Sequence, residues 1–468
     1  MRMREGGPAA RRRSLAAVSS GVFCVQLDAF ALNPALPGIG RELHATGAGM
    51  SWVVSGYLLA AGALMPGAGR LGDLLGRRMV LTVGLMVFGV ASLVCALAPS
   101  LPVLVAARVA QGVGGALTMP VGLALLTNAY PPAARGRALG WALGAGGVAT
   151  ACGPFAGGVL TGALSWRAVF WVNVPVALMA AVWAARAADS RDTGAPRSVD
   201  GKGLVTLTAA VAGLAVLLDR GPVWGWRSGR AVLTLALVTV ALLVFVRCER
   251  AAAHPLVGPG LFRNRPFVVL TAAGAVANAA TVVFLVVVPL ALQGPWGLSA
   301  AVAGAVFLAP ATAMALAGPV AGRIPGAGAV RAMAWCLGLG AAGLCAVPVA
   351  PALPGRIAAA TLCGAALGVA NALTLIATQA AVAPERAGEA SGVTKTVITV
   401  AAGLGVSLCG PLSGPHGGPV SAPALGGALT GAGLCCLTGA LLLGLLSRGW
   451  CADRQARGGR IEATRSVD

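Results

Sequence analysis

The feature of this sequence that most restricts its fold is a long succession of apolar segments, most of them about 20 residues or longer and almost free of charge. A helix needs about 20 apolar residues to cross the hydrocarbon core of a bilayer. Only 10% of the residues are charged, whereas roughly a quarter are charged in soluble domains. Such a chain cannot cover a surface that faces water, so the sequence predicts an all-α polytopic membrane protein.

We expect fourteen transmembrane helices, arranged along the chain as six, two and six. The segments lie at about 14–36, 50–69, 79–98, 102–128, 137–162 and 166–187, then 201–219 and 230–247, then 266–292, 299–320, 329–349, 355–382, 390–413 and 423–446. The expected organisation is an N-terminal tail (1–13), an N-terminal six-helix bundle (14–187), a linker with two inserted helices (188–265), a C-terminal six-helix bundle (266–446) and a C-terminal tail (447–468).

The distribution of basic residues predicts the orientation. With the N-terminus inside the cell, 27 of the 34 Lys and Arg residues fall in segments on the cytoplasmic side, Lys395 among them, and 6 fall outside. Basic residues accumulate in cytoplasmic loops, so both termini are expected to be cytoplasmic. Because the cations form short clusters between apolar segments, the net charge of +20 points to membrane lipids as partners and not to nucleic acid.

The two six-helix blocks share an internal repeat at an offset of 252 residues. The matching pairs are Gly112 and Gly364, Pro132 and Pro384, Gly136 and Gly388, Ala138 and Ala390, Gly140 and Gly392, and Gly153 and Gly405. Internal repeats are typical of secondary transporters, whose substrate site lies between the repeats near the membrane midplane.

Two ionisable residues lie deep within expected helices. Asp28 is the only acidic residue so placed, and Arg108 is the only basic one. Ionisable groups in the hydrocarbon region are costly and usually functional, and protonation of a buried carboxylate can respond to its surroundings. Gln111 shares the helical face of Arg108. The alternative for both residues is a purely structural role in fixing helix packing.

The segment Gly69-Arg-Leu-Gly-Asp-Leu-Leu-Gly-Arg-Arg78 joins the second and third expected helices. Its glycines permit a tight turn. Asp73 can accept hydrogen bonds at a helix end, and Arg77 and Arg78 are expected to face lipid headgroups.

The fifth expected helix contains a run of small residues. Gly153 and Gly157 form a small-xxx-small face for close helix packing, and Pro154 weakens the helix between them. The sequence leaves open whether this run serves as a hinge or for packing alone.

The sequence offers no catalytic or metal-binding cluster. Its three histidines lie in expected loops, and it has no GxxxxGK[ST] motif for ATP. We therefore expect no metal, no cofactor and no enzymatic activity.

In this order and spacing, the motifs resemble those of the major facilitator superfamily, specifically its fourteen-helix drug:proton antiporter branch, which includes antibiotic exporters of actinomycetes. The resemblance is carried by Leu27 to Pro37 (LDAFALNPALP), by Gly69, Asp73, Gly76, Arg77 and Arg78, by Arg108, Gln111, Gly112 and Gly114, by Gly153, Pro154, Gly157 and Gly158, and by Ser165 to Pro175 (SWRAVFWVNVP). These stretches span the first six helices.

The resemblance implies alternating access, in which two six-helix bundles rock about a central cavity and a proton gradient drives export of small, hydrophobic drugs or antibiotics from a bacterial cell. The residues of proton coupling and of the central cavity would be Asp28, Arg108, Gln111 and Asn33. Asp73 and Arg77 would latch the inward gate. Because the loop near Gly322 and Arg323 lacks an acidic residue, the gate is expected to work from the first half only. We expect a monomer.

Three alternatives remain at this point. A symporter importing a metabolite on the same fold is disfavoured by the Gly-Pro run and the six-two-six layout. A polytopic membrane enzyme would need an interfacial cluster such as His/Asp, and a passive channel would need rings of charge. The cargo could be cationic, or neutral if Asp28 serves only protons.

Overall fold

The computed structural model describes residues 7–44, 47–187, 201–252, 258–293, 298, 300–325, 328–409 and 422–465. Within these ranges the regular secondary structure is helical throughout. The N-terminal half consists of α1 (Pro8–Ala31), η1 (Asn33–Ala35), α2 (Leu36–Glu42), α3 (Gly47–Leu75), α4 (Arg77–Ala96), α5 (Leu101–Ala129), α6 (Pro132–Ala163) and α7 (Arg167–Ala185).

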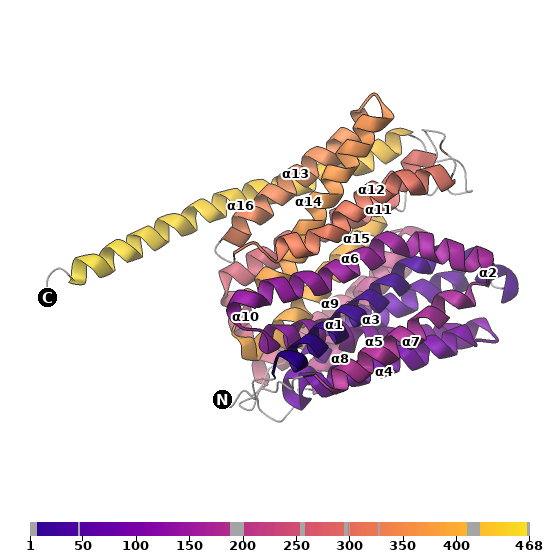
Figure 1. Cartoon of the computed structure of the whole chain (residues 1–468), viewed down its shortest axis with the longest axis horizontal. Helices are drawn as coiled ribbons and strands as arrows, with labels where there is room; N and C mark the ends of the chain where they lie inside the picture. Colours follow the sequence, from indigo (N-terminus) through magenta and orange to yellow (C-terminus); the bar gives the residue numbers. More distant parts are fainter. Residues whose placement is uncertain are drawn as a thin grey trace.

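Two further helices, α8 (Gly201–Trp224) and α9 (Gly229–Ala251), lie in the segment 188–265, whose first residues, 188–200, are outside the described residues. The C-terminal half consists of α10 (Pro259–Arg263), α11 (Arg265–Gln293), α12 (Ala300–Ala321), α13 (Ala329–Val349), α14 (Leu353–Ala380), η3 (Pro384–Arg386), α15 (Ala387–Cys409) and α16 (Ala422–Arg465). The last helix continues past the expected boundary at 446 and extends well beyond the bundle (Figure 1).

Helix packing divides the molecule into two groups. In the N-terminal half, α1 packs on α6 and α7, while α5 packs on α3 and α4. In the C-terminal half, α14 packs on α12 and α13, and α11 packs on α15 and α16. The halves meet where α6 lies against α12 and where α3 lies against α15. Figure 1 shows the N-terminal group in indigo to magenta and the C-terminal group in orange to yellow. Helices α8 and α9 pack on each other, and α8 also packs on α3 and α15.

The helices have the length and composition of membrane spans. Among the described residues, eleven are long and apolar enough to cross a bilayer, and α6 adds a twelfth if its two segments, bent by 50° at Pro154, form one span. The apolar part of α12, Ala305–Ala321, is shorter. The predicted all-α membrane fold is confirmed, whereas the structure does not establish the predicted number of fourteen spans.

Glycines of the internal repeat bring the two halves into backbone contact. A Cβ atom on Gly136 of α6 would meet the carbonyl oxygen of Gly322, and one on Gly388 of α15 would meet that of Gly69. Gly136 and Gly388 are 252 residues apart and thus make equivalent contacts on the two sides of the interface. Across the same interface the hydroxyl of Thr127 donates to Oε1 of Gln379, 3.2 Å away and also 252 residues further on.

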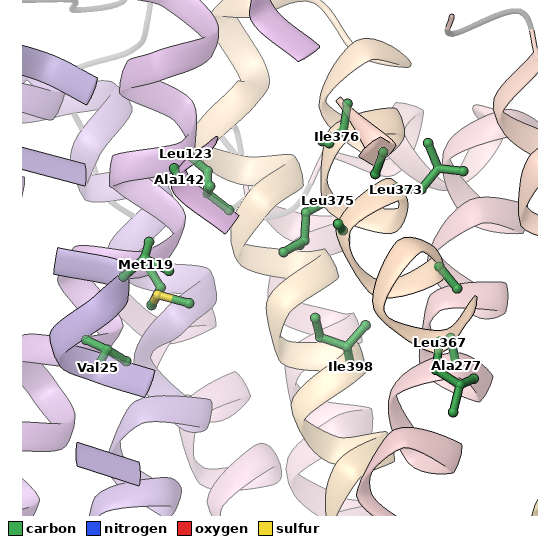
Figure 2. Close-up of a cluster of buried hydrophobic side chains, with 14 of the residues drawn as sticks. Val25, Met119, Leu123, Ala142, Ala277, Leu367, Leu373, Leu375, Ile376 and Ile398 are labelled. Carbon is green, nitrogen blue, oxygen red and sulfur yellow. The ribbon is translucent and has the colours of Figure 1, made fainter. Parts of the chain in front are cut away.

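The core between the helices is apolar and extends across both halves. Figure 2 shows Met119 and Val25 from the N-terminal half, and Leu375 and Ile398 from the C-terminal half, in one cluster of buried hydrophobic side chains. A polar group in this region is therefore costly unless it has a hydrogen-bond partner.

Candidate functional site

Helix α1 presents two different faces. Val22, Gln26 and Phe30 recur every four residues and line a cavity between the two halves. Asp28 lies two residues from both Gln26 and Phe30, which rotates it by about 200° on a helix of 3.6 residues per turn. It is therefore on the far face of α1, where it is fully buried within the N-terminal half.

The carboxylate of Asp28 is held by side chains from two other helices. Arg108 of α5 forms an ion pair with its Oδ2 atom. Oδ1 accepts a hydrogen bond from Nε2 of Gln111 at 2.9 Å and another from Nδ2 of Asn173, on α7, at 3.0 Å. An acid that accepts from three donors has the geometry of an ionised carboxylate. Protonation would turn one acceptor into a donor and break this arrangement.

The guanidinium group of Arg108 is equally enclosed. Its Nε atom donates to the carbonyl of Val53 on α3 at 2.9 Å, and the ring of Tyr57 covers it at 4.3 Å from the ring centroid. It also donates to Oε1 of Gln111 at 2.6 Å. Arg108 stays charged in any accessible state, so it needs Asp28 or another electron-rich group at all times.

The network joins five helices of the N-terminal half. Asp28 stands on α1, Tyr57 on α3, Ser92 on α4, Gln111 on α5 and Asn173 on α7; Nε2 of Gln111 also donates to Oγ of Ser92 at 2.9 Å. A change in the charge of Asp28 would therefore alter contacts that involve all five helices.

The structure brings together the three residues predicted from their place in the apolar spans and adds partners that the sequence did not reveal. Asn173 lies within the stretch Ser165 to Pro175, and its neutral side chain gave no signal beyond a lone amide in an apolar segment. Its Oδ1 atom is buried without a hydrogen-bond donor in the described structure. Asn33 lies in η1, and its side chain is outside the described residues.

The cavity between the halves has a volume of about 160 Å³ and takes its walls from both of them. The described residues that line it include Gln26, Phe30 and Thr150 from the N-terminal half and Asn278, Asn371 and Lys395 from the C-terminal half. Asp28, Arg108 and Gln111 are not among them. The acid–base pair and the cavity thus lie on opposite sides of α1.

The structure corrects the sequence-based prediction that Lys395 belongs to a segment on the cytoplasmic side. It lies about two turns into α15 and lines the central cavity. Arg108 is therefore not the only basic residue deep within a helix. The misassignment arose because Lys395 stands near the start of its apolar segment, where cations usually reach the membrane surface.

The turn between α3 and α4 forms a closed contact between the halves. Gly76 allows the turn because its φ of 104° is in the region that favours glycine. Arg77 donates to Oδ1 of Asp73 through Nε at 3.0 Å and to the carbonyl of Glu385, on η3 of the C-terminal half, at 3.0 Å. Asp73 Oδ2 in turn accepts from the backbone amide of Glu389 at 3.2 Å.

One expectation about this turn was wrong. Arg77 does not face lipid headgroups but is buried, with 1% of its surface exposed. The ion pair of this contact lies in the first half, and backbone groups of η3 and α15 complete the contact. That the gate works from the first half only, without the loop near Gly322 and Arg323, stays a prediction. Arg78 is partly buried, and Gly69 lies against Gly388.

The small residues of α6 have distinct surroundings. A Cβ atom on Gly153 would meet Phe30, and one on Gly157 would overlap the backbone of Ala31, so both bring α6 close to α1. Gly158 has open space instead. The bend of α6 is at Pro154, whose side chain is outside the described residues.

Glu42 ties α2 to the start of α7, at the end of α1 that is remote from the α3–α4 turn. Trp166 donates from Nε1 to Oε2 of Glu42 at 2.6 Å, and Arg167 forms an ion pair with Oε1. The hydrogen bond from Trp166, followed by that from Arg167, lowers the pKa of Glu42 below its usual 4.5. This link fixes α2, which lies in the segment that connects α1 to α3, against the start of α7.

Taken together, the apolar helices, the cavity between two repeat-related halves and the buried acid–base pair define a multi-pass membrane protein built as secondary transporters are. The chain belongs to the Major Facilitator Superfamily, because the sequence model of that family matches residues 18–406. Its members are transporters, which sets aside the alternative of a membrane enzyme.

Curated relatives carry names of drug-resistance, export and transport proteins. The chain is 37% identical over 313 residues to the tetracenomycin C resistance and export protein of Streptomyces glaucescens, an alignment that covers 66% of this chain and 58% of that protein. It is 32% identical over 412 residues to the multidrug resistance protein Stp of Mycobacterium tuberculosis, covering 85% and 75%. The multidrug transporter protein MdtP of Bacillus subtilis is 29% identical over 322 residues, covering 69% and 59%.

The fold also has a match among solved structures. The crystal structure of the human organic anion transporter MFSD10 (TETRAN) superposes with a TM-score of 0.68 and covers 94% of this chain and all of that one. The sequences are 16% identical, so the likeness is one of fold.

Proposed function

We propose that this protein is a proton-coupled exporter of small, hydrophobic organic compounds such as drugs or antibiotics, and that it works by alternating access in a bacterial plasma membrane. The name of the Streptomyces relative, a resistance and export protein, supports the direction of transport. The multidrug names of the relatives from Mycobacterium and Bacillus support the kind of cargo. The family and the helical fold support the transport mechanism.

The observation that carries the proposed proton coupling is the position of Asp28. It is the acid of a sealed network, and its helix also lines the cavity. When Asp28 takes up a proton, Arg108 loses its counter-charge. Its guanidinium group then keeps only its contacts with Gln111, Val53 and Tyr57. Rotation of the Asn173 amide would let its unpartnered Oδ1 accept the new O–H. Each of these changes moves α1 against α5 or α7, and α1 carries Gln26 and Phe30 in the cavity wall.

In this mechanism the structure represents a state closed at the end of the α3–α4 turn. The Asp73–Arg77 pair and the glycine contacts shut that end, and the cavity of about 160 Å³ is smaller than the roughly 300–1,000 Å³ of typical small-molecule sites. The cavity must widen when the halves rock. The glycine-rich contact of α6 with α1 lets one half move as a unit.

The proposal includes the arrangement in the membrane. Two six-helix bundles (14–187 and 266–446) would move about the two inserted helices, with both termini in the cytoplasm, no cofactor and no second subunit. Lipids and protons would be its partners beside the cargo.

Reconstituted protein tests the function directly. In proteoliposomes with an imposed pH gradient and a pH-sensitive dye, adding a transported compound should discharge the gradient. Tetracenomycin C and a panel of other apolar antibiotics are suitable first compounds. If no compound discharges the gradient, although the protein is folded and inserted, proton-coupled export is excluded.

A further inference from the structure

The central cavity contains one unusual charge. Of the 34 basic residues in the chain, only Lys202 and Lys395 are lysines. Lys202 is exposed at the beginning of α8. Lys395 lines the cavity between the halves, and it is the single charged side chain among the described residues that do so.

Among the residues that the structure describes, none pairs with the ammonium group of Lys395. In the described ranges it makes no hydrogen bond and no ion pair. Asp28 cannot serve it, because that carboxylate is held by Arg108 on the opposite face of α1. An ammonium group has three donors and no acceptor, and its enclosure without a counter-charge is costly. A molecule that occupies the cavity can supply this counter-charge, because Lys395 is part of the cavity wall.

The other polar groups of the cavity are neutral. The Nδ2 atom of Asn278 donates to the carbonyl of Ile398 at 2.6 Å, and that of Asn371 donates to Oγ1 of Thr281 at 2.7 Å. Their amide groups are thereby fixed, and their Oδ1 atoms are left as acceptors. The remaining wall is largely apolar and includes Met119, Leu375 and Ile398, which Figure 2 places on both sides of the interface.

We propose that Lys395 binds an anionic oxygen of the cargo, and that the exported compounds are apolar organic acids bearing a carboxylate or an ionised phenol. A neighbouring hydroxyl of such a compound could donate to Asn278 or Asn371, while its apolar body contacts Met119, Leu375 or Ile398. This inference rests on the export function proposed above and narrows its cargo, because a cationic compound would be repelled by the one fixed charge in the cavity.

A second cavity along the same interface has the same sign of charge. It has a volume of about 440 Å³, lies beside the contact of Gly136 with Gly322, and is lined by Arg135 and Arg323. Its described lining contains no acidic residue. Arginines at this end of the interface are also expected because they are attracted to lipid headgroups. The proposal therefore depends mainly on Lys395.

A matched set of fluorescent compounds tests the preference for an anion. Dansylglycine, dansylamide and dansylcadaverine share one fluorophore and are respectively anionic, neutral and cationic near pH 7. Binding to the full-length protein in lipid nanodiscs should be about tenfold or more tighter for dansylglycine than for the other two, as a charge-assisted hydrogen bond implies. Tighter binding of dansylcadaverine, or no binding of dansylglycine, would overturn the inference.

Variants then assign the preference to Lys395. Lys395→Gln should weaken dansylglycine about tenfold or more and leave dansylamide nearly unchanged, while Lys395→Arg should retain much of the preference. Lys202→Gln is the matched control and should change neither. Unchanged dansylglycine affinity in Lys395→Gln would contradict the proposal. Binding requires no pH gradient, so this result is independent of the gradient-discharge test of the proposed function.

Chemical labelling gives a second readout that does not depend on a substitution in the cavity. In Lys202→Arg, Lys395 is the one remaining side-chain amine. Its reaction with trinitrobenzenesulfonate, followed at its own peptide by mass spectrometry, should slow in the presence of dansylglycine and not of dansylamide. Equal labelling rates of Lys395 with both compounds would show that the anion binds at another site and would contradict the proposal.

Discussion

Gln26 and Asp28 stand two residues apart on α1 and point in opposite directions. Gln26 lines the cavity between the halves, whereas Asp28 is sealed against Arg108, Gln111 and Asn173. The proposed sites for cargo and proton are therefore separate, and α1 is the element they share. Coupling in this arrangement must pass through movement of α1, because the described cavity wall does not include Asp28.

Asn173 should support coupling through its hydrogen bond to Asp28. In Asn173→Leu, Oδ1 of Asp28 loses one of its two amide donors, and we expect a loss of stability of about 1–3 kcal/mol. Cargo-driven proton flux should fall more steeply than cargo binding. Asn173→Gln, which keeps an amide, should retain more flux. Flux that stays at the wild-type level in Asn173→Leu would show that the α7 contact is only structural.

Gly157 should be required for the approach of α6 to α1. Gly157→Ala introduces a Cβ atom that overlaps the backbone of Ala31, which should cost about 1–3 kcal/mol and lower the thermal unfolding temperature. Gly158→Ala is the control, because nothing lies within 4 Å of its added Cβ. Equal unfolding temperatures for the two variants would contradict the packing role.

Arg77 should keep the α3–α4 end of the interface shut. Arg77→Gln leaves the carboxylate of Asp73 buried without its ion-pair partner and weakens the bonds to η3, so this end should open. Spin labels at Leu75 and Ala380, which are both exposed, would report a longer distance in a variant freed of native cysteines. Arg78→Gln removes a neighbouring charge but keeps the Asp73–Arg77 pair, and should leave the distance unchanged. An unchanged distance in Arg77→Gln would exclude the latch.

Glu42 should contribute stability that depends on pH. Its pKa is lower in the folded protein, so its contribution is present above the usual value of 4.5 and is lost as the pH falls through the folded value. The unfolding temperature of wild type should exceed that of Glu42→Gln at pH 7, and the difference should shrink in acid. A difference that persists unchanged at about pH 3 would contradict this assignment.

The sequence was most informative where a residue violates the chemistry of the membrane. Asp28 and Arg108 could be singled out because charges in apolar segments are costly, and Gly76 because a tight turn between spans needs glycine. Gly69 lies within α3 instead, and its small size permits the contact with Gly388. The all-α membrane fold followed from the apolar segments themselves. The resemblance to the family was confirmed by the match over residues 18–406.

Other parts of the site depend on tertiary packing that periodicity does not encode. Asn173 carries no charge and causes no conspicuous break in an apolar segment. Lys395 lies where a cation at the membrane surface is expected, and the packing of α15 against α3 and α11 was needed to place it in a cavity. The burial of Arg77 likewise depends on carbonyl groups about 300 residues away in the chain.

The most direct test of the account is the effect of Asp28→Asn on cargo-driven proton movement. Purified wild type, Asp28→Asn and Asp28→Glu would be compared in proteoliposomes, with binding of the same cargo and the unfolding temperature measured in parallel. The account predicts that Asp28→Asn still binds cargo but does not discharge the pH gradient, and that Asp28→Glu retains part of the discharge. Discharge at the wild-type rate by folded Asp28→Asn would contradict the proposed role of Asp28.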